Sequence, residues 1–346
     1  MKSIILVGGM GTRLRPLTYE MPKQMLPLVG VPMIECVFEM LAQHGISEVV
    51  LSLGYLPNHF ISAYPDGSIA GVKISYAVEP EPLDTAGAIR FAAEYAGIDE
   101  TFLVVNGDVL TDLDVTALVA FHRAHGAEGT IALHPVQDPS RFGVVVTNDD
   151  GRVEAFIEKP PREEAPTNLI NAGTYVLEPS VLARIDAGRR VSVEREVFPA
   201  LAAAGTLFAM ADDAYWLDTG TPATFLQANI DVLNGRDATR LAQGLVGTTW
   251  CHSTSRVADS ARLVNAVVDR NCVVGENVVL EDVILMPGAV VQDNVQIRSS
   301  IIGPRAVIGT TSVLGPTCVV GAEVSVAEGS QFSGDVQLGA GQSGGI

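Results

Sequence analysis

Apolar residues recur with two different periods along the chain, and the change of period divides it into two parts. Up to about residue 234, short apolar runs alternate with segments whose apolar residues lie three or four positions apart. The runs predict buried strands and the segments predict amphipathic helices. We expect strands at 4–7, 49–53 and 102–106, and helices at 33–43, from Thr85 as N-cap to about 95, at 115–125 and at 222–233.

Strands that alternate with helices indicate a doubly wound α/β fold around a mostly parallel sheet. One stretch departs from this order. Two strand-like runs within 144–158 flank the turn Asn148-Asp149-Asp150-Gly151 and predict a hairpin. Because doubly wound folds bind ligands at the carboxyl ends of their strands, Asp108, just after the strand 102–106, is placed near a candidate site.

Beyond residue 257 an aliphatic residue recurs about every six positions. Three steps are of five instead, at 263–268, 280–285 and 297–302, and they lie 17 residues apart. A three-sided coil with one corner a residue short explains this spacing, so we expect a hexapeptide-repeat β-helix of about five coils. The phased residues are Val257, Leu263, Val268, Val274, Leu280, Leu285, Val291, Ile297, Ile302, Ile308, Leu314, Val320, Val326, Phe332 and Leu338.

The two periods predict two domains, as does the length of 346 residues. We place an α/β domain at 1–234, a linker at 235–256 and the β-helix at 257–346. Some acyltransferases are also built on such coils and use a histidine there as general base. The coils from Val257 onward contain no histidine. We therefore expect the β-helix to serve homo-oligomer contacts or allosteric control rather than a second activity.

Composition limits the partners and the compartment. A formal net charge of −18 argues against nucleic acid and anionic membranes as partners. No apolar run is long enough for a secretory signal or a membrane span, so we expect a cytoplasmic protein. The four cysteines show no metal-ligand spacing and are expected to be buried, reduced thiols. Lysine is scarce, at Lys2, Lys23, Lys73 and Lys159.

A glycine-rich turn at residues 8–11 follows the first predicted strand. Backbone N–H groups in such a turn can hold a phosphate, although the pattern alone is weak evidence. The turn lacks the third glycine of a dinucleotide fingerprint and the GK[ST] of a P-loop. Three cations, Arg13, Arg15 and Lys23, follow closely in an otherwise acidic chain, which favours a phosphate ligand.

These residues also resemble the leading motif of the sugar-1-phosphate nucleotidyltransferases, through the stretch 8–18 followed by Pro22-Lys23. The resemblance covers essentially the whole first domain. It extends to the appended β-helix, which is usual in one branch and implies a left-handed coil. The stretch 191–199 is most similar to the mannose-1-phosphate guanylyltransferase branch. Further motifs follow in the family's order at 81–87, 106–108, 156–160, 171–173 and 216–222.

The resemblance implies a reaction and the residues for it. A sugar 1-phosphate attacks the α-phosphorus of a nucleoside triphosphate in line and pyrophosphate leaves, so that positioning and charge neutralisation dominate. The implied nucleotide-binding residues are Gly8, Gly9, Gly11, Thr12, Arg13, Glu79 and Gly87, and the implied sugar-phosphate-binding residues are Gly143, Glu158, Lys159 and Asn171. The implied catalytic residues are Arg13, Lys23, Asp108, Lys159 and Asp218, with Asp108 and Asp218 as the protein's share of a Mg²⁺ site.

The residues themselves leave several roles open. Asp108 and Asp218, each taken singly, also suit a turn or a helix cap. Glu79 is placed either to accept the two adjacent N–H groups of guanine or to be an exposed residue at a strand end. The family usually has glycine where this chain has Asp84, and a carboxylate beside a base or sugar pocket can alter selectivity.

Three functions therefore stand side by side. The first is transfer of a guanylyl group from GTP to mannose 1-phosphate, giving GDP-mannose. The second is thymidylyl or uridylyl transfer to glucose 1-phosphate. The third is an inactive regulatory subunit of the same architecture, against which the retention of the five implied catalytic residues argues.

Overall fold

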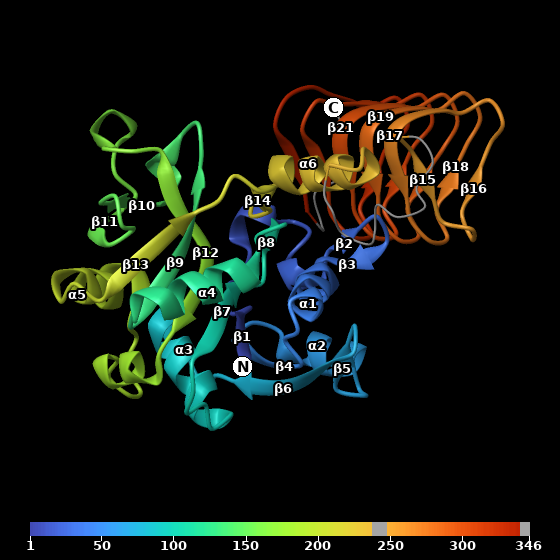
Figure 1. Ribbon diagram of the computed structural model, residues 1–346. Coiled ribbons are helices and arrows are strands. Elements are labelled where there is room, and N and C mark those ends of the chain that lie inside the picture. The colour runs from blue at the N-terminus through green and yellow to red at the C-terminus, as the bar shows by residue number, and fades with distance from the viewer. Residues whose placement is uncertain (237–247, 340–346) are drawn as a thin grey trace. The chain divides into compact units, whose positions relative to one another are not determined.

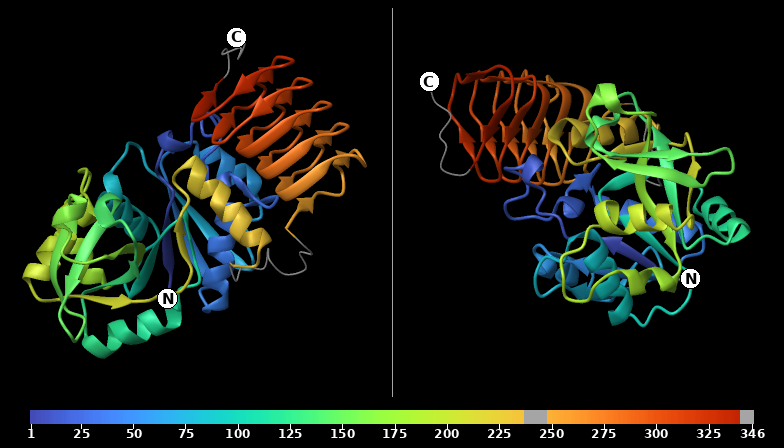
Figure 2. Two further views of the ribbon diagram at one scale, coloured as in Figure 1. Left: turned by 90° about the horizontal axis from the view of Figure 1, so that it is seen from above. Right: turned by 90° about the vertical axis from the view of Figure 1, so that its left-hand side faces the viewer.

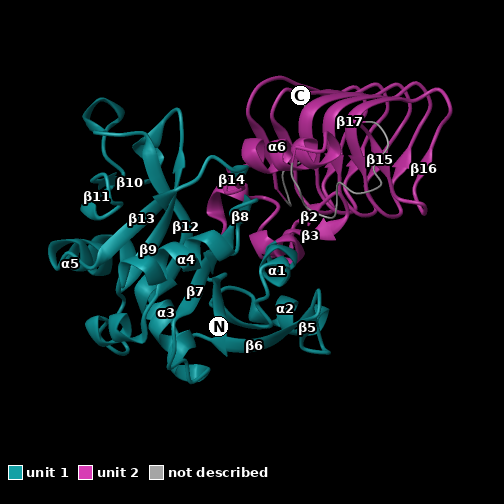
Figure 3. Ribbon diagram, viewed as in Figure 1, with its two compact units in different colours: residues 1–9, 37–216 teal, residues 10–36, 217–346 magenta. Residues whose placement is uncertain are grey.

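The computed structural model describes residues 1–236 and 248–339. The chain forms two compact units, shown in Figure 3. Unit 1 comprises residues 1–9 and 37–216, and unit 2 comprises residues 10–36 and 217–346. Residues 10–36 thus group with the C-terminal part of the chain rather than with the sheet they follow. The domain limits expected from the sequence, 1–234 and 257–346, stay predictions.

Unit 1 is organised around a ten-stranded sheet with a parallel centre (Figure 1). Strand β1 (Ser3–Leu6) lies between β4 (Glu48–Leu53) and β7 (Phe102–Asn106), parallel to both. β6 (Val72–Val78) continues the parallel order beyond β4, and the short β5 (Ser68–Ile69) closes that edge antiparallel to β6. These strands form because their runs are mainly apolar and most of their side chains are buried in β1, β4 and β7.

The other half of the sheet is mainly antiparallel. β12 (Leu169–Leu177) runs antiparallel to β7 and to β9 (Gly129–Pro135), and β13 (Leu207–Ala211) lies parallel to β9. β10 (Gly143–Thr147) and β11 (Val153–Glu158) form the expected hairpin, with Gly143 opposite Glu158. The hairpin prediction is confirmed.

Most predicted helices have the expected bounds. α1 (Met33–Gln43), α4 (Val115–His125) and α6 (Pro222–Leu233) agree with the sequence pattern, and Thr221 caps α6. The expected cap Thr85 is wrong, because Leu83 is the N-cap of α3 (Asp84–Tyr95) and Thr85 lies inside the helix. Unit 1 also contains α2 (Pro57–Ala63), α5 (Phe198–Ala203), β8 (Val109–Thr111), a π-helix η6 (Val193–Val197) and the 3-10 turns η3 (Pro139–Arg141), η4 (Arg162–Glu164) and η5 (Pro179–Arg184).

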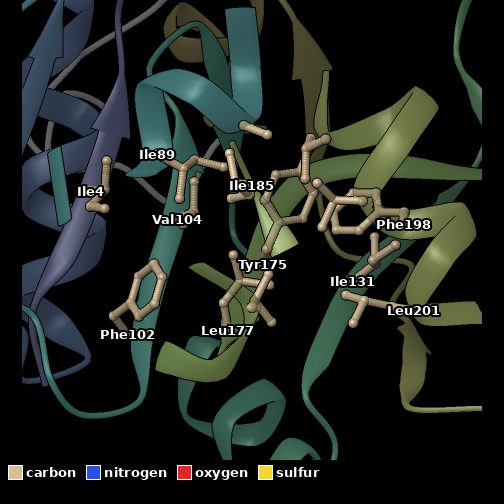
Figure 4. Packing of buried hydrophobic residues seen from close by; sticks show 14 of the residues in the cluster. Ile4, Ile89, Phe102, Val104, Ile131, Tyr175, Leu177, Ile185, Phe198 and Leu201 are labelled. Carbon is tan, nitrogen blue, oxygen red and sulfur yellow. The ribbon is translucent and has the colours of Figure 1, made fainter. Parts of the chain in front are cut away.

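One hydrophobic cluster holds unit 1 together (Figure 4). Phe102 and Val104 of β7 belong to it, as does Tyr175 of β12, whose ring meets Phe198 of α5 edge-on at 5.0 Å between centroids. Each large apolar side chain buried in this way stabilises the fold by about 1.5–3 kcal/mol. The carboxyl ends of β7 and β11 and the middle of β12 are thereby fixed against one another.

Unit 2 is dominated by the β-helix, whose parallel strands stack coil upon coil (Figure 2). All fifteen phased residues predicted from the sequence lie in or against its interior cluster, so the hexapeptide interpretation is confirmed. The strands are β15 (Trp250–Cys251), β16 (Arg256–Val257), β17 (Arg262–Val268), β18 (Val273–Val274), β19 (Val279–Leu285), β20 (Val290–Val291), β21 (Gln296–Ile302), β22 (Val307–Ile308), β23 (Val313–Leu314), β24 (Cys318–Val320), β25 (Ser325–Val326), β26 (Gln331–Phe332) and β27 (Val336–Leu338).

The corners of the coils explain the short steps. Within the bent strands β17, β19 and β21 the backbone turns at Asn265, Asp282 and Ser299, each with a positive φ between 43° and 55°. These three corners lie within the short steps of the sequence. The next coil instead turns through Gly315 to Thr317, one residue more, and pairs Ile302 with Val320 at a spacing of 18. A left-handed residue makes the sharp bend without a glycine when its side chain is short and polar.

Helix α6 covers part of the outer surface of the coils within unit 2. The outward residues beneath this region form an aliphatic column: Val267, Ile284, Ile301 and Val319 are at most 3% exposed. Outward positions on a solvated coil are usually polar, so this column indicates a coil face that is covered. A cavity of about 210 Å³ lies beside it between α6 and the coils, lined by Leu226, Gln227, Ile301 and Val319 among others. It contains none of the predicted site residues.

Two expectations about composition can be compared with the structure. Cys36, Cys272 and Cys318 are buried free thiols, but Cys251 is exposed, so the expectation of burial is wrong for that residue. Burial raises the pKa of Cys272 to about 11, which keeps its thiol protonated. No helix formed by residues 1–236 and 248–339 combines the length and apolar character that a membrane crossing requires.

Candidate active site

The predicted site residues divide between the two units. Gly8, Gly9, Glu79, Gly87, Asp108, Gly143, Glu158, Lys159 and Asn171 belong to unit 1, whereas Gly11, Thr12, Arg13, Lys23 and Asp218 belong to unit 2. The glycine-rich turn itself crosses the limit between residues 9 and 10. We describe the two sets separately and call them the half-site of unit 1 and the half-site of unit 2.

The unit 2 half-site begins at Gly11. Its backbone is left-handed, with φ +60°, and a Cβ atom there would lie 3.1 Å from Thr18 Cγ2 and 3.3 Å from Lys23 Cβ. Thr18 Oγ1 donates a hydrogen bond of 2.7 Å to the Gly11 carbonyl oxygen. Glycine adopts this conformation without strain, and the turn brings the base of the Lys23 side chain against the loop. Thr12 and Arg13 follow on the exposed 3-10 turn η1 (Thr12–Leu14).

Arg13 and Asp218 meet at Gly220 within the same unit. A Cβ atom at Gly220 would lie 2.5 Å from Arg13 Nη2 and 2.7 Å from Asp218 Oδ1. Asp218 Oδ1 accepts a hydrogen bond of 2.7 Å from the Gly220 N–H. The carboxylate of Asp218, at the end of β14 (Trp216–Asp218), and the guanidinium of Arg13, on η1, therefore lie side by side just before the capped start of α6.

In unit 1, the hairpin β10–β11 holds Glu158 and Lys159. Gly143 is buried, and a Cβ atom there would lie 2.5 Å from Phe156 Cζ and 3.1 Å from Glu158 Oε2, so a larger residue would displace both. Lys159 Nζ pairs with Glu158 Oε1 at 2.9 Å. Lys159 is exposed and its backbone has φ +51°, a conformation that non-glycine residues adopt at a cost of about 1–3 kcal/mol. Strain of this kind clusters at binding sites.

Two hydrogen bonds orient the side-chain amide of Asn171. Its Nδ2 donates to the Tyr175 hydroxyl oxygen at 2.9 Å, and its Oδ1 accepts from the Gly173 N–H at 2.9 Å. Burial raises the pKa of Tyr175, and the nearby carboxylates of Glu194, Glu158 and Asp108 raise it further. The phenol thus stays protonated and can donate in turn. The structure brings Asn171, Glu158 and Asp108 into one electrostatic neighbourhood around Tyr175.

Glu79 lies beside the glycine turn of unit 1. A Cβ atom at Gly8 would be 3.6 Å from Glu79 Oε1. Each carboxylate oxygen already accepts one hydrogen bond, Oε1 from Ser52 Oγ at 3.0 Å and Oε2 from the Leu83 N–H at 3.1 Å. Glu79 is partly buried, so it is not simply an exposed residue at a strand end. Every carboxylate oxygen can accept more than one donor, which leaves it able to bind a ligand.

Gly87 packs against the backbone of residues 189–191. It is buried in α3, and a Cβ atom there would lie 2.9 Å from the Arg189 carbonyl oxygen. The N–H groups of Ala86 and Gly87 both donate to the Val191 carbonyl oxygen, at 2.8 and 3.2 Å. The motifs at 81–87 and 191–199 therefore interlock, and glycine at 87 permits the close approach of the two segments.

Several residues that the sequence analysis did not single out support the half-site of unit 1. The Trp216 Nε1–H donates to the Ala172 carbonyl oxygen at 2.9 Å, between Asn171 and Gly173. Glu194 Oε2 accepts from Thr85 Oγ1 and from Ser192 Oγ, both at 2.7 Å. Tyr175 is the third such residue. Each of the three lies inside or beside a sequence motif, and this position could have drawn attention to it. The supporting role of each depends on contacts between distant segments, which the sequence does not show.

The two aspartates predicted as metal ligands belong to different units, Asp108 to unit 1 and Asp218 to unit 2. Among residues 1–236 and 248–339, no group of three histidine, cysteine, aspartate or glutamate side chains is arranged to hold a metal ion. Asp108 and Asp218 are both partly buried. Mg²⁺ is commonly held by one or two carboxylates, with phosphate oxygens and water as its other ligands.

Comparisons with known proteins show which family the chain is similar to. Residues 2–235 match the family model described as Nucleotidyl transferase, and residues 238–332 match one described as EIF2B subunit epsilon LbH domain. The chain therefore belongs to the nucleotidyl transferase family and carries a C-terminal left-handed β-helix. The two expectations about fold, a doubly wound nucleotidyltransferase domain and a hexapeptide β-helix, are confirmed.

Within this family the chain is similar to enzymes named mannose-1-phosphate guanylyltransferase. That of Mycobacterium tuberculosis is 43% identical over 270 residues, which cover 77% of this chain and 74% of the relative. The probable mannose-1-phosphate guanylyltransferase 3 of Oryza sativa subsp. japonica is 41% identical and covers 75% and 73%. HddC from Yersinia pseudotuberculosis complexed with GMP-PN has a TM-score of 0.57, 29% identity, and coverage of 66% and 97%.

Proposed function

We propose that the protein transfers the guanylyl group of GTP to mannose 1-phosphate, forming GDP-mannose and releasing pyrophosphate. The enzyme class follows from the family. The observation that carries the proposal is the gathering of Asn171, Glu158 and Asp108 around Tyr175, in a chain whose relatives are named for this reaction.

The half-site of unit 2, together with Gly8 and Gly9, is proposed to bind the triphosphate. Backbone N–H groups of the turn and of the N-terminal end of η1 can donate hydrogen bonds to phosphate oxygens. Arg13 and Lys23 add positive charge to a chain that is strongly acidic overall. Their electrostatic stabilisation acts on the leaving pyrophosphate, where negative charge increases during the reaction.

The half-site of unit 1 is proposed to bind the sugar phosphate. Lys159 projects from a strained backbone position and supplies the charge for the phosphate. Glu158 and Asn171 supply acceptors and donors for sugar hydroxyls, and Gly143 leaves the space that Glu158 needs. The attacking phosphate oxygen is already an anion, so the reaction requires orientation rather than a general base.

Asp108 and Asp218 would hold Mg²⁺ together with phosphate oxygens and water. When bound, the ion would neutralise charge on the triphosphate. Glu79 is proposed to accept the N1–H and the exocyclic amine of guanine, because its carboxylate lies beside Gly8 and can accept further donors.

Pyrophosphate release by the purified full chain tests the proposal. GTP, dTTP and UTP would each be paired with mannose 1-phosphate and with glucose 1-phosphate in the presence of Mg²⁺. We expect the highest kcat/KM with GTP and mannose 1-phosphate, and loss of activity when Mg²⁺ is removed with a chelator. Preference for dTTP or UTP with glucose 1-phosphate would overturn the specificity, and no release with any pair would overturn the enzyme assignment.

We also propose that identical chains assemble into an oligomer and that the protein acts in the cytoplasm. The proposed domain limits lie near residues 234 and 257. Light scattering coupled to gel filtration measures the assembly state. A mass equal to one chain of 36.5 kDa at working concentrations would contradict the oligomer.

A further inference from the structure

A short hairpin between Lys23 and α1 is held in a strained conformation. β2 (Pro27–Leu28) and β3 (Val31–Pro32) meet at a turn formed by Val29 and Gly30. The φ angles of these two residues are +45° and +83°. A β-branched residue such as valine is a genuine outlier at positive φ. Such a conformation persists only where the surrounding structure holds it in place.

Three contacts within unit 2 hold this turn. The Val29 N–H donates to Asn229 Oδ1 of α6 at 2.9 Å, and Asn229 is fully buried. The Gly30 carbonyl oxygen accepts a hydrogen bond of 2.8 Å from Arg270 Nη2. Gly30 also packs against the Trp250 indole, so that a Cβ atom at Gly30 would overlap the ring. Trp250 and Arg270 belong to the first coils of the β-helix.

The other end of the same segment lies on the last coils. A Cβ atom at Gly321 would lie 3.0 Å from Pro16 Cβ. At Gly339 a Cβ atom would be 3.8 Å from Tyr19 Cε2 and 3.9 Å from Pro16 Cβ. The segment that carries Arg13 and Lys23 therefore touches both early and late coils.

The two contact regions lie along one corner of the β-helix. The strand register pairs Val268 with Leu285, Leu285 with Ile302 and Ile302 with Val320. Arg270 and Gly321 follow the first and last of these residues closely, so they lie near the same corner, three coils apart. Stacked strands are spaced by about 4.8 Å, so this separation is roughly 14 Å along the coil axis. Backbone hydrogen bonds between the coils keep that distance constant.

We propose that the β-helix is the rigid support that positions the triphosphate-binding loop, with Arg270 and Trp250 at one end and Gly321 at the other. The proposal rests on the proposed binding of the triphosphate by Arg13 and Lys23. Arg270, Trp250 and Gly321 are positioning residues, because they act through the segment 10–36 and are not assigned contacts with substrate. A loop held at both ends binds its ligand without losing additional conformational entropy.

The substitution Arg270→Ala tests one end of the support. It removes the hydrogen bond to Gly30 and is expected to raise the KM for GTP about tenfold, the equivalent of one net hydrogen bond. The kcat and the KM for mannose 1-phosphate are expected to change less than about twofold, because the half-site of unit 1 is untouched. Arg298→Ala is the matched control, since Arg298 is a β-helix arginine paired with Glu281 at 3.0 Å. It removes the same charge and should leave the KM for GTP unchanged.

A pair of glycines tests the other end. Gly303 and Gly321 occupy the same corner in successive coils. A Cβ atom at Gly303 would lie 2.6 Å from the Val320 carbonyl oxygen of the following coil, and one at Gly321 would lie 2.9 Å from the Leu338 carbonyl oxygen. Only the Cβ atom at Gly321 would also meet Pro16. Both Gly303→Ala and Gly321→Ala should lower the thermal midpoint, but only Gly321→Ala should raise the KM for GTP.

Amide hydrogen exchange of the full chain supplies a readout that does not depend on activity. Faster exchange at residues 26–33 in Arg270→Ala, and not in Arg298→Ala, is expected. Equal KM values for GTP in each variant and its control, with unchanged exchange, would overturn the support and leave the proposed function intact. Absence of activity in the unsubstituted protein would instead overturn the proposed function, and the exchange measurement would still decide about the support.

Discussion

The two parts of the molecule use left-handed backbone in different ways. In the β-helix, residues with positive φ recur at each corner, as at Asn271, Gly288, Arg305 and Glu323, because every side of the coil must end in a sharp turn. In unit 1 two such residues are isolated and lie inside motifs, Asp84 and Lys159. The same cost, about 1–3 kcal/mol per residue, therefore supports architecture in the β-helix, whereas at Lys159 we propose that it places a side chain that binds phosphate.

The largest effect is expected at Asp108 and Asp218, which lie outside the β-helix and are proposed to bind Mg²⁺. Asp108→Asn and Asp218→Asn keep the shape of each side chain but remove the charge proposed to bind Mg²⁺. Because metal charge stabilisation contributes several kcal/mol, we expect each to lower kcat by about a hundredfold or more. Steady-state pyrophosphate release measures this, and circular dichroism checks that the fold is kept. Near-normal turnover in either variant would remove that residue from the proposed ligands.

Lys159→Gly separates strain from function at one position. Glycine adopts φ +51° freely, so the substitution removes backbone strain from the folded state. Glycine also raises the conformational entropy of the unfolded chain, which offsets this gain, so the free energy of unfolding should change by less than about 1 kcal/mol. The lost charge-assisted hydrogen bonds, at about 1.5–3 kcal/mol, should lower kcat/KM for mannose 1-phosphate by about 10- to 100-fold. The KM for GTP should stay the same.

Lys159→Ala is the companion variant, because it removes the charge and keeps a Cβ atom. It should lower kcat/KM for mannose 1-phosphate as much as Lys159→Gly does, and it should be no more stable. If Lys159→Gly retained full activity, the strained lysine would be a structural corner like those of the β-helix, and the contrast between the two parts would disappear.

A corner of the β-helix should show the opposite result. Asn277 is exposed, has φ +57°, and donates from Nδ2 to Asn294 Oδ1 of the next coil at 3.2 Å. Asn277→Ala should cost about 1–2 kcal/mol of unfolding free energy with no change in kcat, whereas Asn277→Gly should cost less. Urea unfolding and pyrophosphate release measure the two quantities. A drop in kcat at this corner would show that corner geometry reaches the active site.

Local patterns were sufficient for much of the fold. The phased aliphatic residues from Val257 to Leu338 predicted the β-helix, because a coil of fixed length repeats its interior position at a fixed interval. Motif order predicted the family, and the hairpin at 144–158 followed from its turn residues. In both cases the information lies within a few residues of the element it describes.

Contacts between distant segments were not predictable in this way. Arg270 and Gly30 are 240 positions apart, and nothing in either stretch signals the hydrogen bond that joins them. Thr85 was expected to cap α3, but its hydroxyl accepts the Val193 N–H at 2.8 Å, across a long separation. The aliphatic column beginning with Val267 offered a clue, since outward apolar residues imply a covering element. The identity of that element, α6, required the structure.

The smallest effect is expected at Asp84, where the family usually has glycine. The structure supplies a physical reason for the difference: φ is +61°, aspartate is among the residues that tolerate this region, and its Oδ1 accepts the Thr85 N–H at 2.9 Å. The exposed side chain therefore stabilises its own turn, and we expect that it does not select the base. Asp84→Gly should leave the ratio of kcat/KM for GTP to that for dTTP within about twofold and change stability by less than about 1 kcal/mol. A shift of that ratio by tenfold or more would mean that the carboxylate contacts the nucleotide, and that isolated left-handed residues in unit 1 serve selectivity as well as placement.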